Sequence, residues 1–253
     1  MKNNKVNLKL LSHTGEPEKV IAMAGKLCYS RSNIDGLEQN LTPENIESFV
    51  NRLVSYGHES PLEHVSFTFA VEGISRACSH QLVRHRIASY SQQSQRYVDL
   101  DKVFDYVTPN IIDCMDERYN TNEYSKEFEK DMEMIHCMYT KWQKVFKTFV
   151  EVADYPTNGM TPQKIANENA RAVLPNACET KLVFTMNLRT LINFVRHRKC
   201  NRAQEEIREV AILIEQTINE KFPILGKILG APCEFGSCPE GSMNCRNPYK
   251  KRG

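Results

Sequence analysis

Residues 65–71, Val65-Ser66-Phe67-Thr68-Phe69-Ala70-Val71, alternate apolar side chains with smaller ones. A period of two predicts a β-strand with one buried face. A second strong strand is expected at 179–187, where one face carries Leu182, Phe184 and Met186. These two segments are the expected centre of a sheet.

Helix signals stand on both sides of the predicted strands. Thr42 can cap a helix, Pro43 suits the first helical position and Glu44 complements the positive end of the helix dipole. Ser75 can cap a helix that runs to Arg84. The other expected helices cover 17–27, 124–152, 163–173, the segment around 191–195, and 203–222.

The remaining segments complete the expected fold. A first strand is predicted at 6–12, a loop at 32–40 and a turn at 154–159. Because strands and helices do not alternate regularly, the pattern favours an α+β fold. We expect a mixed or antiparallel central sheet packed with helices, in a single compact domain with a helical portion. The apolar stripe of 124–152, which includes Trp142, predicts a core-facing or partner-facing surface.

Composition narrows the class of protein. The chain has 253 residues and a formal net charge of +2, too small to indicate a general nucleic-acid or membrane-surface binder. No apolar run approaches membrane-spanning length, and no secretory signal precedes the first strand. Nine cysteines, an odd number, predict free thiols in a reducing cytoplasm.

The last part of the chain differs from the rest. We expect a domain at 1–222 and a cysteine-containing tail at 223–253 with no assigned role. Cys233, Cys238 and Cys245 supply three thiols without a histidine nearby, whereas a structural zinc site has four ligands. The sequence therefore predicts no metal site.

The segment 84–97, Arg-His-Arg-Ile-Ala-Ser-Tyr-Ser-Gln-Gln-Ser-Gln-Arg-Tyr, combines cations with hydroxyls and amides and has no acidic residue. Guanidinium groups bind phosphates and carboxylates through planar forks of donors, so this composition predicts an anion site. A second Arg-His-Arg stands at 196–198, close to Arg202. No G-x-G, P-loop or G-x-S-x-G motif is present, so any phosphate must be bound by side chains.

Several blocks together resemble the flavin-dependent thymidylate synthases. The pattern Arg84-His85-Arg86-x-x-Ser89-x-x-x-x-Ser94-x-Arg96 is similar to the signature of that family. Further similar blocks, in matching order from about residue 20 to 220, are Gly57–His64, Arg171–Pro175, Asn187–Phe194, and Arg198 with Ala203–Ile207.

The resemblance implies an enzyme that converts dUMP to dTMP. It would use 5,10-methylenetetrahydrofolate as carbon donor, NADPH as reductant and FAD as cofactor, in a homotetramer with active sites at the subunit interfaces. Arg198 would lie against the uracil and polarise it, as the catalytic residue. The resemblance places dUMP at Gln81, Gln92, Ser94, Arg96, Arg171 and Arg198. It places FAD at His58, Ser60, Glu63, Arg84, His85, Arg86, Asn187, Arg189 and Asn193.

Some positions depart from the family pattern. Position 92 is often acidic but is Gln92 here, position 91 is often asparagine but is Ser91, and position 202, sometimes histidine, is Arg202. Ser94 has no visible activating base, so we interpret it as a dUMP ligand, not a nucleophile.

An alternative interpretation is a non-enzymatic RNA-binding module. It would use the two Arg-His-Arg clusters for phosphates and stack bases on Tyr90 and Tyr97. The near-neutral net charge and the asparagine, glutamine and glutamate residues among the cations argue against it.

Overall fold

The computed structural model describes residues 5–98, 100 and 104–252, which fall into two compact units. The first unit contains the described part of Met1–Asn7, Glu72–His80 and Gln92–Leu182. The second contains Leu8–Val71, Gln81–Ser91 and the described part of Val183–Gly253.

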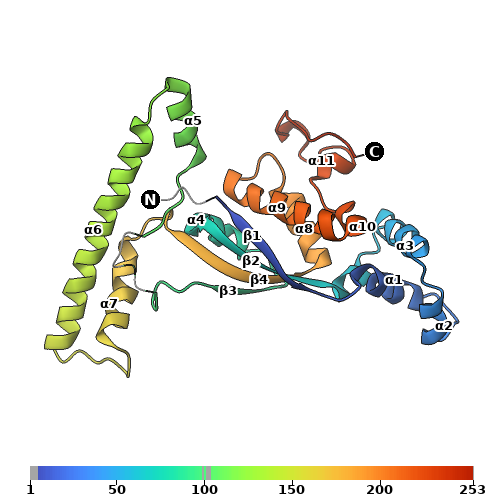
Figure 1. Cartoon of the computed structure of the whole chain (residues 1–253), viewed down its shortest axis with the longest axis horizontal. Helices are drawn as coiled ribbons and strands as arrows, with labels where there is room; N and C mark the ends of the chain where they lie inside the picture. Colours follow the sequence, from blue (N-terminus) through green and yellow to red (C-terminus); the bar gives the residue numbers. More distant parts are fainter. Residues whose placement is uncertain (1–4, 99, 101–103, 253) are drawn as a thin grey trace. The chain divides into compact units, whose positions relative to one another are not determined.

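Four strands form one sheet in the order β1-β2-β4-β3 (Figure 1). Their bounds are β1 Asn7–His13, β2 Ser66–Ser75, β3 Ala88–Gln92 and β4 Glu179–Asn187. The hydroxyls of Thr68 and Thr185 are 2.9 Å apart, and the Gly73 amide donates to Glu179 over 3.0 Å. Residue numbers thus rise along β2 as they fall along β4, so the pair is antiparallel. The predicted α+β class is confirmed.

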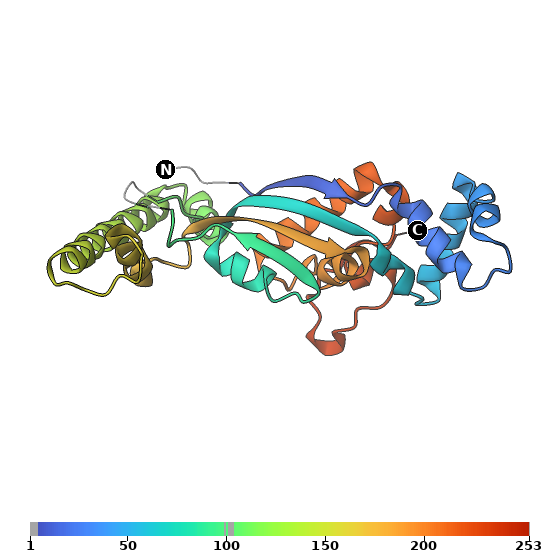
Figure 2. The ribbon, with the colours of Figure 1, turned by 90° about the horizontal axis from the view of Figure 1, so that it is seen from below.

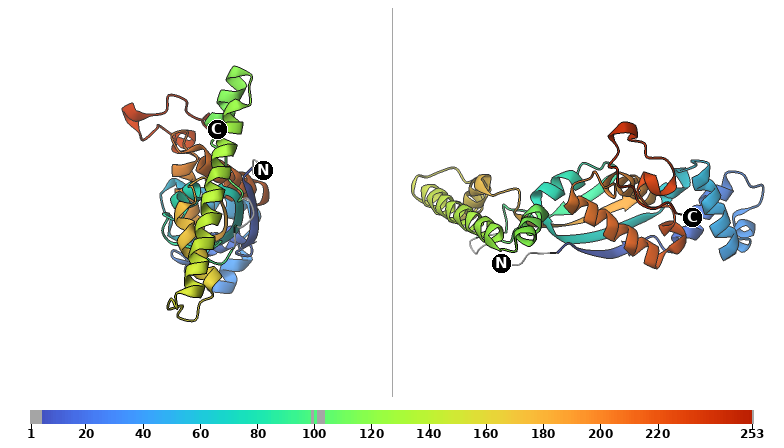
Figure 3. Two further views of the ribbon diagram at one scale, coloured as in Figure 1. Left: turned by 90° about the vertical axis from the view of Figure 1, so that its left-hand side faces the viewer. Right: turned by 90° about the horizontal axis from the view of Figure 1, so that it is seen from above.

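In the second unit, one face of the sheet is covered by α8 (Leu188–Arg198) and α9 (Glu205–Lys221), as Figure 3 shows from above. Phe67 and Phe69 of β2 and Phe184 of β4 are fully buried. The rings of Phe69 and Phe184 stack with centroids 5.5 Å apart. The alternation that predicts these strands therefore corresponds to their buried face.

The second unit also contains α1 (Pro17–Leu27), α2 (Ile34–Gln39), α3 (Pro43–Ser55) and the 3₁₀ helix η1 (Ser60–His64). Thr42 caps α3 as predicted, accepting a hydrogen bond from the Asn45 amide at 3.3 Å. The loop predicted at 32–40 is wrong, because α2 lies there. Its start is fixed by the Asn33 side chain, which accepts from the Gly36 amide at 2.9 Å.

The first unit is mainly helical. It contains α5 (Asn110–Tyr119), α6 (Glu123–Val152), α7 (Pro162–Ala170) and the 3₁₀ helix η2 (Arg171–Val173), with α6 lying along α7 (Figure 2). Between α6 and α7 the buried Gln143 amide donates to Asn167 over 2.7 Å. The helix predicted at 163–173 is α7 continued by η2. Helix α4 (Arg76–Leu82) carries residues of both units.

The C-terminal part is folded. It contains α10 (Pro223–Gly226), α11 (Pro232–Phe235) and the 3₁₀ helix η3 (Gly241–Met243), and it belongs to the second unit. The domain boundary expected at residue 222 stays a prediction. In the described part of the chain, no helix combines the length and apolarity needed to cross a membrane. Among the same residues, no group of three or more histidine, cysteine or acidic side chains could hold a metal ion.

Candidate functional site

One candidate site lies in the second unit, where β4 ends and α8 begins. The Asn187 side chain accepts a hydrogen bond from the Thr190 amide at 2.9 Å and caps α8. In the next turn, Arg189 donates to Glu59 over 3.2 Å and to Glu63 over 2.5 Å. Because η1 packs against α8, the loop carrying these glutamates is fixed beside the helix start.

A cavity of about 320 Å³ opens at this point. It contains five of the predicted flavin residues, namely Glu63, Arg86, Asn187, Arg189 and Asn193. Glu59, Ile87, Thr190, Ile192 and Arg196 also line it. Guanidinium and amide donors thus meet carboxylate acceptors at the N-terminus of α8, a combination suited to an anionic ligand that also carries hydroxyl groups.

Ile87 has an unusual backbone at this cavity. Its φ is 65°, in the left-handed region that β-branched residues rarely adopt. Its side chain is 78% exposed, so burial of an apolar group does not explain the conformation. Backbone strain of this kind is concentrated at functional sites. The strained residue directly follows Arg86.

His85 and Arg198 meet in the same unit. Arg198 donates from Nε to Nε2 of His85 over 3.0 Å, and the imidazole packs edge-on against Phe194 with centroids 4.8 Å apart. Burial, followed by the charges of Arg198 and His197, lowers the pKa of His85 from 6.5 to about 4. The imidazole is therefore neutral at pH 7. Within the described residues, the terminal nitrogens of Arg198 form no hydrogen bond or ion pair.

Tyr90 fixes the turn that carries Arg84 to Arg86. Its hydroxyl lies 2.9 Å from the Leu82 carbonyl oxygen and 3.0 Å from that of His85. Burial raises the pKa of Tyr90 to about 12. The half-buried ring thus supports the turn from inside.

The other predicted flavin residues of the second unit do not line the 320 Å³ cavity. Arg84, His58 and Ser60 are exposed, and His58 lies 6.0 Å from the ring of Tyr56. Glu59, which the sequence reasoning did not select, is 3.7 Å from Arg196 and also binds Arg189. The sequence signal that could have identified Glu59 is its position in the 57–64 loop, which resembles the family.

The predicted dUMP residues are divided between the units: Gln81 and Arg198 are in the second, and Gln92, Ser94, Arg96 and Arg171 in the first. Arg96 lies 2.5 Å from Glu168 of α7, and its backbone amide donates to the Ser94 hydroxyl over 3.2 Å. Arg171 donates to the Glu168 carbonyl over 3.1 Å. Arg96 and Arg171 therefore both contact Glu168, and Ser94 contacts the backbone of Arg96.

Two observations in this group concern ligand binding. Arg96 Nε is buried and has no hydrogen-bond partner among the described residues. An unpartnered buried donor is costly, which favours a ligand that accepts from it. Gln92, by contrast, already donates its amide to Ser79 over 2.9 Å and to Thr180 over 3.1 Å.

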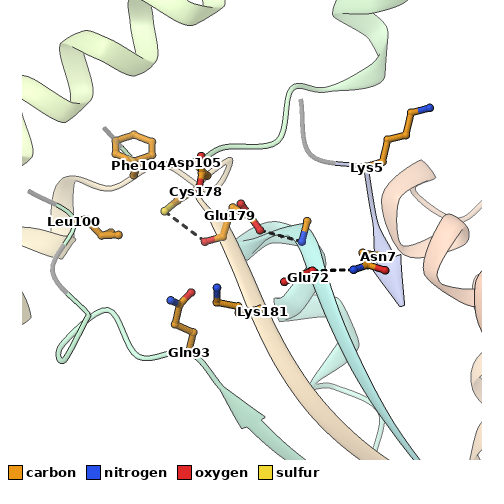
Figure 4. A pocket seen from close by; sticks show the side chains of 11 residues that line it. Lys5, Asn7, Glu72, Gln93, Leu100, Phe104, Asp105, Cys178, Glu179 and Lys181 are labelled. Atoms are coloured by element: carbon orange, nitrogen blue, oxygen red, sulfur yellow. Dashed lines mark hydrogen bonds between the residues drawn. The ribbon is translucent and has the colours of Figure 1, made fainter. Parts of the chain in front are cut away.

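A second cavity in the first unit, of about 370 Å³, is shown in Figure 4. Its wall contains Cys178, Glu179 and Lys181 of the β4 region together with Glu72 and Asn7. Burial raises the pKa of the Cys178 thiol to about 11, so it stays protonated at neutral pH. Because the thiolate is the nucleophile, Cys178 is not prepared for covalent catalysis.

Comparisons with known proteins all identify similarity to thymidylate synthases. Residues 9–224 match the sequence model of a family described as thymidylate synthase complementing protein. A flavin-dependent thymidylate synthase of Clostridium tetani is 50% identical, over 95% of this chain and 93% of its own length. One from Geobacter sulfurreducens is 40% identical, over 95% and 94%, and one from Pyrococcus furiosus 38%, over 94% and 91%.

Proposed function

Because the chain belongs to the flavin-dependent thymidylate synthases, an enzyme family, we propose that it converts dUMP to dTMP by reductive methylation in the cytoplasm. The proposed carbon donor is 5,10-methylenetetrahydrofolate, the reductant NADPH and the flavin FAD. Membership in an enzyme family sets aside the non-enzymatic RNA-binding alternative.

The residues at the start of α8 fit a flavin nucleotide. Arg86, Arg189 and Asn193 offer donors for a diphosphate, and Glu63 offers an acceptor for sugar hydroxyls. A volume of about 320 Å³ is at the low end for a small-molecule site, so it suits one part of FAD. When bound, the flavin would supply the redox chemistry between NADPH and the transferred one-carbon unit.

The pairing of Arg198 with His85 is the observation that supports the proposal most directly. A guanidinium with free terminal nitrogens suits a pyrimidine oxygen on which negative charge develops as C5 becomes nucleophilic. His85 is a neutral acceptor, so it orients Arg198 without neutralising it. Arg198 thereby keeps its full charge for the substrate.

Residues of the first unit are proposed to bind the dUMP phosphate. Arg96, with its unpartnered Nε, and Arg171 both contact Glu168, and the Arg96 amide donates to the Ser94 hydroxyl. Among the described residues, the Ser94 hydroxyl contacts no histidine or carboxylate that would activate it. We therefore assign Ser94 to binding. Gln81 and Gln92 complete the proposed dUMP set.

An exposed stripe on α6 supports the homotetramer. Met138, Trp142, Val145 and Phe149 are each at least 40% exposed and recur at helical spacing. Apolar side chains grouped in this way indicate a surface that another protein covers. We propose that copies of the chain associate through such surfaces and share active sites.

The test uses the purified full chain. Its visible spectrum should show a flavin that bleaches on anaerobic addition of NADPH, and dUMP with methylenetetrahydrofolate should then yield dTMP. A colourless protein that cannot be reconstituted with FAD would contradict the proposal. Light scattering should give four times the 29.2 kDa of one chain.

A further inference from the structure

The C-terminal segment 227–252 is attached to the end of α8 by a buried ionic cluster. Lys199, which follows Arg198 directly, lies 2.7 Å from Glu215 and 2.7 Å from Glu234. Arg252 pairs with the same two carboxylates, at 2.8 Å for Glu234. Lys199, Glu215 and Glu234 are each less than 10% exposed. Charges this deeply buried require their partners, so the cluster fixes the segment in place.

Additional contacts bind the segment to the turn between α8 and α9. Arg202 donates to Glu240 over 2.8 Å and to the Met243 carbonyl over 2.7 Å. Asn201 donates to the Asn247 carbonyl over 2.6 Å. Arg202, one of the departures from the family pattern, is therefore used inside the chain to hold the segment.

A cavity of about 750 Å³ lies between the segment and the end of α8, within the range of small-molecule sites. One wall comes from α8 and the following turn, with Arg196, His197 and Arg198. The other comes from the C-terminal segment. Its lining includes the apolar Pro239, Met243, Pro248 and Tyr249, and the basic Lys251.

The charges around this cavity favour an anion. Its lining includes four arginine or lysine side chains and one carboxylate, Glu240, which Arg202 already neutralises. Among the described residues, Lys251 and the terminal nitrogens of Arg198 have no hydrogen-bond or ion-pair partner. Cations beside an aromatic and apolar wall suit a ligand that joins charged groups to flat rings.

We propose that this cavity binds the anionic, ring-bearing part of a co-substrate. The inference rests on the proposed function, whose two co-substrates share this chemistry: NADPH has phosphates beside adenine, and the folate has glutamate carboxylates beside an aromatic ring. None of the residues that line this cavity is assigned to the flavin, and only Arg198 is also assigned to dUMP. The C-terminal segment is thus a wall of a binding site, and most of it lies beyond the residues 9–224 that match the family.

Adjacent lysines give a matched test. Lys251 lines the cavity and Lys250 does not, although both are exposed. Using full-length protein loaded with FAD, we would titrate NADP⁺ and tetrahydrofolate separately by anaerobic calorimetry into the wild type, Lys251→Ala and Lys250→Ala. Lys251→Ala should weaken one ligand roughly tenfold, the usual loss for one charge-assisted hydrogen bond. Lys250→Ala should bind both like the wild type.

The ligand that weakens identifies the occupant. A loss confined to NADP⁺ assigns the cavity to the reductant, and a loss confined to tetrahydrofolate assigns it to the carbon donor. Unchanged affinities for both ligands in Lys251→Ala and in Tyr249→Ala, at wild-type melting temperatures, would overturn the inference. The dTMP assay on the wild type tests the proposed function separately, because these titrations do not depend on turnover.

Discussion

Arg198 donates from Nε to Nε2 of His85 over 3.0 Å, and the acceptor is a neutral imidazole. With Nε2 accepting, the ring proton is inferred to be on Nδ1. A carboxylate at this position would offset the guanidinium charge, whereas the imidazole only directs it. Arg198 adds to the effect of burial in lowering the pKa of His85, and His85 in turn orients Arg198.

Titration of His85 should contribute to the pH dependence of the free energy of unfolding. Its pKa is about 4 in the folded protein against an ordinary 6.5, so between these values the unfolded chain binds more protons. The stabilisation that comes from this lowered pKa is complete above pH 6.5 and is lost as the pH falls toward 4. His85→Gln keeps an acceptor but cannot titrate, so it should lose less stability between pH 7 and 5. Urea unfolding at several pH values checks this prediction. If the free energy of unfolding changed equally with pH in the wild type and in His85→Gln, the prediction would be wrong.

Removal of the Arg198 guanidinium should strongly slow turnover without unfolding the protein. Arg198→Ala is expected to lower kcat by roughly 10²–10³-fold, the usual loss for one group that stabilises transition-state charge. Arg198→Lys should recover little, because an ammonium lacks the planar fork. Arg118→Ala, an exposed arginine in the last turn of α5, is the control. Full activity in Arg198→Ala would refute the proposed role.

The buried ionic cluster should matter far more than an exposed ion pair. Lys199→Met leaves two buried carboxylates with Arg252 alone and should lower the free energy of unfolding by about 3 kcal/mol. Lys227→Met removes an exposed pair with Glu47, 2.6 Å long, and should cost less than about 1 kcal/mol. Urea unfolding of both variants gives the comparison. Equal decreases in the free energy of unfolding would show that burial does not determine how much an ion pair contributes to stability.

Thiol chemistry should be dispensable for turnover. Cys178 has its pKa raised to about 11 by burial, so iodoacetamide near neutral pH should modify the exposed Cys28 and Cys114 well before it. Peptide mass mapping over time gives the order of labelling. Cys178→Ala, and a folded variant without any cysteine, should both form dTMP. Loss of the chemical step in either variant would contradict the assignment.

The fold was predictable where a local signal defines the element. The strand expected at 179–187 matches β4, because its alternation corresponds directly to a buried face. A capping residue such as Thr42 marks a helix start through a hydrogen bond that spans three residues. Because these signals are local, they can be recognised without knowledge of the tertiary structure.

Other elements depend on partners far away in the sequence. β3 has the polar sequence Ala-Ser-Tyr-Ser-Gln and no run of apolar residues, and it forms because its backbone pairs with β4 at the sheet edge. α5 was not predicted either, and it packs against α6, whose start is held by the Asp116 carboxylate. Such elements arise from tertiary pairing, which the local sequence pattern does not encode.

In the candidate site, too, some features follow from local sequence and others depend on partners far away in the chain. Arg-His-Arg at 84–86 marks an anion site in the sequence itself, but nothing local indicates that His85 and Arg198 are partners 113 positions apart. The cavity lined by Lys251 was equally inaccessible to sequence analysis. It exists because Lys199 and Arg252 bind the same pair of carboxylates.

The two contacts of Tyr90 affect the thermodynamics of ligand binding. Its single hydroxyl proton is shared between the carbonyl oxygens of residues 82 and 85, so the turn bearing Arg84 and Arg86 is ordered before any ligand arrives. A preorganised turn loses little conformational entropy on association. Tyr90→Phe should therefore make the entropy of flavin binding less favourable while the guanidinium contacts remain.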